Sequence, residues 1–175
     1  MKRCIVMIGM PACGKSTAGV VLAKTTGRRF IDTDLLIQEQ EGMLLQEIID
    51  NKGSEYFKKA EEGVLRALEA ENAVISTGGS AVYYPPAMEH LRCLGPAVYL
   101  KLSAESIRRR LKNIRTRGIA MAPAQTIEEL YRSRAPLYER YADITISAEG
   151  LNVEQTVERI LAELRRQGEF RQRKR

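Results

Sequence analysis

Short apolar runs alternate along the chain with longer segments of mixed polarity. Apolar runs of four to eight residues bounded by turn residues are typical of strands buried in a parallel sheet. Five such runs occur, namely RCIVMI (3–8), RFID (29–32), AVIST (73–77), AVYLKL (97–102) and DITIS (143–147). Their alternation with helical segments predicts an α/β fold of three layers, a parallel sheet with helices on both faces.

The segments between these runs have helical periodicity or helix-end signals. Val20, Val21, Leu22 and Ala23 supply the expected inner side of the first helix, which Gly27 ends, while Ser54 and Ser103 are expected N-caps. We expect helices over 14–27, 34–53 with a break near Gly42, 54–71, 86–94, 103–113, 126–142 with Pro136 inside or near a break, and 152–167.

One segment does not follow this alternation. The sequence IRTRGIAMAPAQ (114–125) has no strong period and is rich in small residues, so we interpret it as a mobile loop. No repeat or linker divides the rest of the chain. We therefore expect a single domain over 1–166, with this loop as an insertion and 167–175 as a basic tail.

Composition and charge limit the classes of partner. The chain has 175 residues, 44% apolar and 29% charged, which is usual for a globular domain. Its net charge is +6, but the segment RRQGEFRQRKR from Arg165 onward holds six basic residues and one acid. The remainder is nearly neutral, so the charge argues against a nucleic-acid partner, and a weak RNA contact of the tail remains open.

Targeting and redox signals are weak. The start, MKRCIVMIGMPAC, resembles a secretion signal, but Gly9 and Pro11 interrupt its apolar run, so we expect a buried first strand. No apolar run approaches the length of a membrane span. The three cysteines lack metal-ligand spacing, which favours reduced thiols and a cytoplasmic location. We expect a monomer.

The segment GMPACGKS (9–16) fits the phosphate-binding pattern G-x-x-x-x-G-K-[ST], directly after an expected strand and opening an expected helix. Glycines at both ends let successive backbone N–H groups converge on phosphate oxygens, and the helix N-terminus adds positive field. Lys15 supplies a charge toward the outer phosphates and Ser16 a hydroxyl for Mg²⁺. The expected ATP-binding residues are Ala12, Cys13, Gly14, Lys15, Ser16 and Thr17.

Cys13 lies inside this loop, at the helix N-terminus, where a thiolate is favoured. A reactive thiol is one interpretation. We prefer the other, a small side chain that fills space.

The segment FIDTD (30–34) places two carboxylates at the end of an expected strand. Residues two apart on a strand share a face, so Asp32 and Asp34 both project toward the carboxyl edge of the sheet, where ligands of parallel sheets bind. We assign Asp32 to Mg²⁺, together with Ser16.

Several motifs together resemble the shikimate kinase family. GMPACGKST, FIDTD, GSEYFKKAE, TGGS, a loop with TRG, and RAPLYERYAD follow in the order and spacing of that family, from about Arg3 to Ile146. The resemblance implies the strand order 2-3-1-4-5 and a lid at about 114–125. It also implies phosphoryl transfer from ATP to the 3-hydroxyl of shikimate, in aromatic amino-acid biosynthesis.

The resemblance also implies roles for individual residues. Arg117 matches a lid arginine that reaches the γ-phosphate, and Arg110 an arginine that stacks on adenine. Asp34 matches a carboxylate that binds the acceptor hydroxyls and accepts the reacting proton. The other implied acceptor-binding residues are Lys58, Glu61, Gly78, Gly79 and Arg134. For Arg110 and Arg117 a solvated charge is the alternative, and for Glu61 a glutamate on a helix surface.

The sequence departs from the family pattern at a few positions. Lys58 replaces an arginine, Ser80 replaces a third glycine, Ala12 replaces a loop glycine, and Gly118 replaces a lid proline. Lysine keeps the charge of arginine but not its bidentate geometry, so acceptor recognition is the part most affected. A kinase of the same fold for another hydroxylated acid, gluconate- or homoserine-like, stays open, as does a nucleotide-dependent RNA-binding module.

Overall fold

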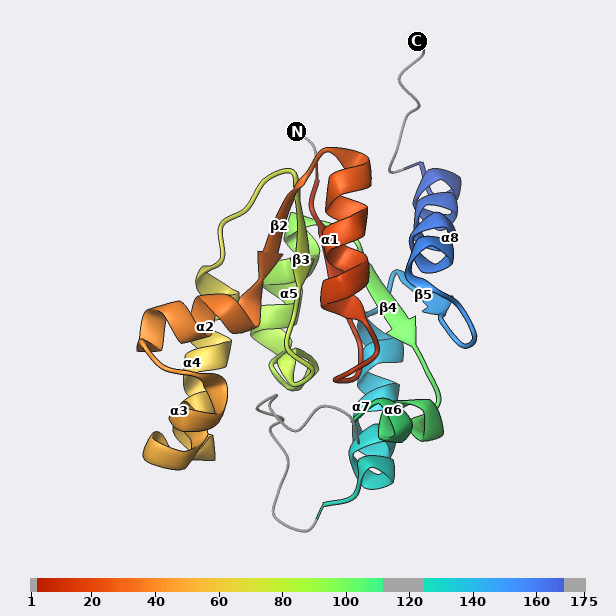
Figure 1. The fold of residues 1–175 in the computed structure, drawn as a ribbon. Coiled ribbons are helices and arrows are strands. Elements are labelled where there is room, and N and C mark those ends of the chain that lie inside the picture. The colour runs from red at the N-terminus through yellow and green to blue at the C-terminus, as the bar shows by residue number, and fades with distance from the viewer. Residues whose placement is uncertain (1–2, 112–124, 169–175) are drawn as a thin grey trace.

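The computed structural model describes residues 3–111 and 125–168 and gives a parallel sheet of five strands (Figure 1). The strands are β1 (Ile5–Ile8), β2 (Arg29–Asp32), β3 (Ala73–Ser76), β4 (Ala97–Lys101) and β5 (Ile144–Ser147). Their order is β2-β3-β1-β4-β5, which confirms the expected order 2-3-1-4-5. The central strand β1 is buried along its whole length, whereas the edge strand β5 alternates buried and exposed residues.

Eight α-helices and one 3-10 turn connect the strands in the described part of the chain. They are α1 (Lys15–Thr26), α2 (Thr33–Glu41), α3 (Leu45–Lys52), α4 (Ser54–Ala67), η1 (Ala81–Tyr83), α5 (Pro85–Leu94), α6 (Ala104–Leu111), α7 (Ile127–Tyr141) and α8 (Val153–Arg166). Helices α1 and α8 pack against each other on one face of the sheet, and α5 and α7 pack on the other (Figure 1). The three expected layers are therefore present.

Helices α2, α3 and α4 form a smaller unit beside the β2 edge of the sheet (Figure 1). They have their own apolar cluster, made of Ile37, Leu45, Ile48, Phe57 and Val64. The unit borders the carboxyl ends of the strands, so helices α2 and α4 can present side chains to a ligand at that edge.

The register of the sheet fixes where these carboxyl ends meet. Asp32 pairs with Ser76, and Ser76 pairs with Met7 on β1. The ends of β1, β2 and β3 therefore lie side by side, and the segments that leave them start from one edge. Gly27 ends α1 in a left-handed conformation, as expected.

Three details of the helix predictions are wrong. Val20 is 49% exposed, because four consecutive residues cannot all face inward on a helix with 3.6 residues per turn. Ser54 is the first residue of α4 rather than its cap, and Gly53 is the N-cap. Helix α4 also ends at Ala67, four residues earlier than expected. Pro136 lies inside α7, which continues through it.

None of the helices in the described ranges is long and apolar enough to cross a bilayer. The expected lid, with Arg117, lies outside the described residues except for Gln125, and so do residues 169–175 of the expected tail.

Candidate active site

The loop between β1 and α1 has a backbone that few residue types adopt. Gly9 and Gly14 have φ of 145° and 99°, and Ala12 has φ of 62°. A Cβ on Gly9 would lie 2.8 Å from the carbonyl oxygen of Leu100, so only glycine fits there. Ala12 keeps the left-handed conformation despite its side chain, at the position where the sequence departs from glycine.

Lys15 is held inside this loop. Its side chain is on the first turn of α1, and its Nζ donates to the backbone oxygens of Gly9 at 2.8 Å and Met10 at 2.9 Å. The residue is only 7% exposed. The ammonium group is therefore placed beside the loop by the backbone itself, where a phosphate group would meet it.

Ser16 and Asp32 form a pair of oxygen ligands next to the loop. The Ser16 hydroxyl donates to Oδ2 of Asp32 at 2.8 Å and lies 3.2 Å from the hydroxyl of Ser76. A hydroxyl and a carboxylate in this position are hard donors of the kind that Mg²⁺ binds. The residues that the sequence assigned to the metal are thus brought together and fit it.

Asp32 has a second contact that positions Asp34. Its Oδ1 accepts a hydrogen bond from the backbone N–H of Asp34 at 3.0 Å and so caps α2. The expected shared strand face is wrong, because β2 ends at Asp32 and Asp34 is in the first turn of α2. Asp32 contacts Ser16 and caps the helix, whereas Asp34 lines a pocket.

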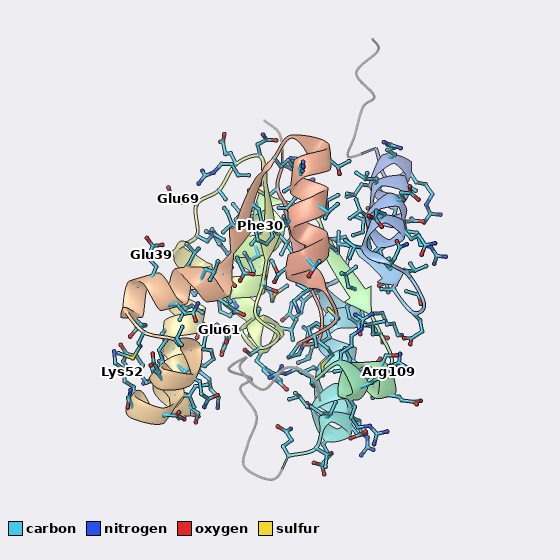
Figure 2. The ribbon with its side chains drawn as sticks, in the orientation of Figure 1. Phe30, Glu39, Lys52, Glu61, Glu69 and Arg109 are labelled. Carbon is cyan, nitrogen blue, oxygen red and sulfur yellow. The ribbon has the colours of Figure 1, made fainter. Side chains whose placement is uncertain are left out.

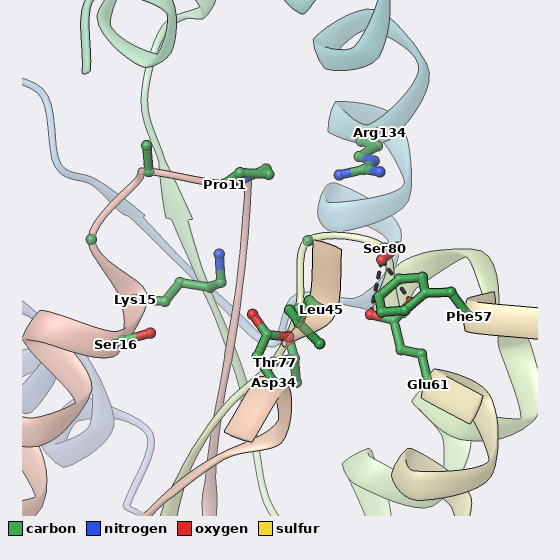
Figure 3. Close-up of a pocket in the computed structure, with 14 residues that line it drawn as sticks. Pro11, Lys15, Ser16, Asp34, Leu45, Phe57, Glu61, Thr77, Ser80 and Arg134 are labelled. Atoms are coloured by element: carbon green, nitrogen blue, oxygen red, sulfur yellow. Dashed lines mark hydrogen bonds between the residues drawn. The ribbon is translucent and has the colours of Figure 1, made fainter. Parts of the chain in front are cut away.

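Most of the expected site residues line that pocket (Figure 3). Lys15 and Ser16 lie on one side of it, Glu61, Ser80 and Arg134 on the other, and Asp34 between them. Its complete lining is Pro11, Ala12, Gly14, Lys15, Ser16, Asp34, Leu45, Phe57, Glu61, Thr77, Gly78, Gly79, Ser80 and Arg134. The loop at Gly9–Ser16 and the charged residues expected to bind the acceptor therefore line one shared pocket.

Gly78 and Gly79 lie where charged groups approach the backbone. A Cβ on Gly78 would be 2.5 Å from Oε1 of Glu61 and 2.9 Å from Oδ1 of Asp34. A Cβ on Gly79 would be 2.9 Å from the NH1 nitrogen of Arg134. The two glycines thus leave room for two carboxylates and a guanidinium.

Glu61 is not a surface residue, so that alternative is wrong. It is 1% exposed and lies in the interior, whereas Glu39 and Glu69 point outward (Figure 2). Burial raises the pKa of Glu61 from its ordinary value of 4.5 to about 7, against hydrogen bonds from Ser80 and Tyr84 that lower it. The nearby charge of Asp34 raises the pKa and that of Arg134 lowers it.

Arg134 reaches the pocket from α7. It is 1% exposed, and its guanidinium carbon lies 5.2 Å from the ring centroid of Tyr83, a cation–π distance. A planar guanidinium in this wall can bind a carboxylate through two parallel hydrogen bonds.

Lys58 is placed differently from the other expected acceptor residues. Its Nζ pairs with Glu55 on the same helix at 2.6 Å, its side chain is 49% exposed, and it does not line the pocket. Its role in acceptor binding stays a prediction.

A second hollow lies on the other side of the loop. It is lined by Cys13, Gly14, Thr17, Ala18, Leu100, Arg110, Ala148, Leu151, Asn152, Val153 and Thr156. The NH1 nitrogen of Arg110 lies 3.3 Å from the backbone oxygens of Ala12 and Cys13, so this arginine is at the loop and not in open solvent. Cys13 is buried, which supports the space-filling interpretation.

Two features of the site were not among the sequence predictions. One is the segment 148–156, which lines this hollow. Its position was a usable signal, because the segment directly follows the carboxyl end of β5, at the edge where ligands of parallel sheets bind. The other is the contact of Tyr84 with Glu61, for which the sequence holds no local signal because the two residues are far apart along the chain.

Known proteins are similar to this chain in sequence and in fold. Residues 11–165 match the sequence model of a family described as shikimate kinase. A shikimate kinase of Sulfurihydrogenibium sp. (strain YO3AOP1) is 35% identical over 163 residues, which cover 93% of this chain and 98% of that protein.

Two solved structures have the same fold over most of their length. Shikimate kinase from Acinetobacter baumannii in complex with shikimate has a TM-score of 0.87 and 29% identity, over 94% of both chains. Shikimate kinase from Aquifex aeolicus has a TM-score of 0.82 and 33% identity, over 94% of this chain and 98% of that one. With the family model matching nearly the whole chain, this protein belongs to the shikimate kinase family, whose enzymes phosphorylate shikimate with ATP and Mg²⁺.

Proposed function

We propose that this protein transfers the γ-phosphoryl group of ATP to the 3-hydroxyl of shikimate, giving shikimate 3-phosphate and ADP. One observation carries the assignment to particular residues. The pocket has the phosphate-binding loop with Lys15 on one side and a carboxylate–guanidinium set with Asp34 and Arg134 on the other. A donor phosphate and an anionic, hydroxylated acceptor fit these two sides.

The nucleotide side neutralises and aligns the phosphates. The backbone N–H groups of the loop residues Ala12, Cys13, Gly14, Lys15, Ser16 and Thr17 are the proposed phosphate cradle. Mg²⁺ bound near Ser16 and Asp32 would neutralise negative charge on the phosphate oxygens. Arg110, beside the hollow lined by 148–156, is the proposed contact for the base. Arg117 is the proposed lid contact for the γ-phosphoryl group.

The acceptor side holds the reacting hydroxyl. Asp34 accepts its proton as the O–H bond breaks, the new O–P bond forms, and ADP leaves with the electron pair of the broken P–O bond. Arg134 binds the acceptor carboxylate. Gly78 and Gly79 are the proposed backbone contacts of the ring, and Glu61 and Lys58 complete the proposed acceptor set.

We also propose that the protein acts as a monomer, with one domain over 1–166 and a basic tail over 167–175 that turnover does not require. Cys4, Cys13 and Cys93 are free thiols, which fits a reducing compartment such as the cytoplasm.

Steady-state turnover of MgATP across a panel of hydroxylated acids tests the substrate. The panel contains shikimate, quinate, gluconate and homoserine, and product is identified by phosphorus NMR. We expect kcat/KM for shikimate to exceed that of the other acids by at least about 100-fold, because a buried polar site rejects analogues that leave its groups unpaired. A shikimate rate equal to the ATP hydrolysis rate without acceptor would refute the proposal.

A further inference from the structure

We propose that Ser80 and Tyr84 are positioning residues of the acceptor site, which hold the Glu61 carboxylate in place through their hydroxyl groups. The inference concerns this chain's own residues and rests on the proposed function for its link to acceptor binding. Neither hydroxyl is expected to touch the reacting atoms.

Two hydroxyl groups contact the carboxylate. The Ser80 hydroxyl lies 2.8 Å from Oε1 and 2.7 Å from Oε2 of Glu61, and the Tyr84 hydroxyl donates to Oε2 at 2.8 Å. The backbone of Gly78 is also close, since a Cβ built there would be 2.5 Å from Oε1. The carboxylate thus has two hydroxyl partners and little free space beside Gly78.

A local turn brings the two hydroxyls to the same place. Ser80 directly precedes the 3-10 turn η1, and Tyr84 directly follows it. The backbone N–H groups of Tyr83 and Tyr84 donate to the oxygens of Ser80 and Ala81 at 2.9 and 3.1 Å. This turn fixes the spacing of the two donors. A glycine at position 80, as in the family pattern, would supply no hydroxyl.

Holding Glu61 matters because the charges around it are close and buried. Asp34 from α2 and Arg134 from α7 act on Glu61 electrostatically, with opposite sign, and both line the same pocket. A buried carboxylate that loses its donors takes up a proton or moves. Either change removes the anion next to Arg134, the proposed contact for the acceptor carboxylate, and disturbs its orientation.

Hydrogen bonds to the ionised form lower a carboxyl pKa, whereas burial and the Asp34 charge raise that of Glu61. Loss of either hydroxyl should therefore raise the pKa of Glu61 further. A role limited to packing would leave the titration of Glu61 unchanged, so titration separates the two interpretations.

The test uses Ser80→Ala and Tyr84→Phe, which remove one hydroxyl each from different positions. Tyr56→Phe is the matched control, because the hydroxyl of Tyr56, a residue 42% exposed, also donates to a glutamate, Glu41, and neither residue lines the pocket. The first readout is the titration of glutamate side-chain carboxyl carbons by carbon-13 NMR, with the Glu61 signal assigned from Glu61→Gln. The second is the acceptor KM and kcat from pH 6 to pH 9.

We expect the Glu61 midpoint to rise by about one pH unit in Ser80→Ala and in Tyr84→Phe, and to stay in place in Tyr56→Phe. The acceptor KM should increase as Glu61 takes up its proton, at a higher pH in these two variants than in the parent, with kcat within about threefold. Unmoved NMR midpoints, or an acceptor KM that is the same in parent and variants across the range, would overturn the inference. If the parent does not turn over shikimate, the proposed function fails, while the NMR titration still decides whether the hydroxyls hold Glu61.

Discussion

The two sides of the pocket are built differently. The proposed nucleotide side comes from one continuous segment, Gly9–Ser16, joined by Asp32 from the next strand. The proposed acceptor side draws Asp34 from α2, Glu61 from α4, Gly78–Ser80 from the segment after β3, and Arg134 from α7. The continuous loop keeps its backbone geometry even at Ala12, the position that departs from glycine, where φ is 62°. The wall of separate segments departs at Ser80, which adds a hydroxyl to the pocket lining.

A change on the nucleotide side should lower the rate of phosphoryl transfer. Lys15→Met keeps the length of the side chain but removes its charge. We expect kcat to fall by at least about 100-fold at saturating acceptor, because charge stabilisation that develops in the transition state is lost. Lys24→Met, on the exposed last turn of the same helix, is the matched control and should keep kcat. Equal kcat in the two variants would contradict the proposed role of Lys15 in the transition state.

A change on the acceptor side should instead weaken binding of the acceptor and leave binding of ATP unchanged. Arg134→Lys keeps the charge and loses the planar fork. We expect the acceptor KM to rise by about 10- to 100-fold, because lysine loses one hydrogen bond of the bidentate pair. The KM for ATP should stay within about threefold. Steady-state kinetics with each substrate varied in turn measures both. An effect on the KM for ATP alone would contradict the assignment of Arg134 to acceptor binding.

The buried carboxyl group of Glu61 should also make the free energy of unfolding depend on pH. The folded-state pKa of Glu61, about 7, is above its ordinary value of 4.5, so the folded state binds the extra proton between these values. The free energy of unfolding should therefore fall as pH rises from 4.5 to 7, by roughly 3 kcal/mol from this group.

Glu61→Gln removes this titration. Urea unfolding of parent and variant at pH 5 and pH 8 gives the comparison, and the parent should lose more stability than the variant between the two pH values. The same pH dependence in both proteins would show that Glu61 is not the group responsible.

Removal of the C-terminal residues after Gly168 should have the smallest effect on turnover. A chain that stops after Gly168 lacks the last basic residues but keeps α8 and its C-cap. We expect kcat and both KM values to stay within about twofold, because no described residue of α8 beyond Thr156 lines either hollow and long-range charge effects are screened by salt. A large loss of turnover, or RNA retention by the full chain alone, would favour the RNA-binding alternative.

The sequence predicts most of what depends on local pattern. The five strands, the loop at Gly9–Ser16 and the pairing of Ser16 with Asp32 follow from apolar runs and one motif, and the structure has them. The strand order and the meeting of Asp34, Glu61 and Arg134 came from the family resemblance, because the pairing of distant segments has no local signal.

The failures have physical reasons. Gly53 ends α3 and also begins α4, so the cap falls one residue before Ser54. Glu61 is adjacent to Glu62 in the sequence, and only tertiary packing decides that the first is buried. The contact of Tyr84 with Glu61 depends on how η1 lies over α4, which no periodicity reports.

Calorimetric titration of shikimate, in the presence of MgADP, into the Lys15→Met and Arg134→Lys variants tests the division of the pocket most directly. We expect Lys15→Met to bind shikimate with a Kd within about threefold of the parent, because a residue that acts on the transition state contributes little to acceptor binding. We expect Arg134→Lys to bind at least about tenfold more weakly, because one hydrogen bond of the bidentate pair is lost. Unchanged binding by Arg134→Lys would contradict the assignment of the acceptor side.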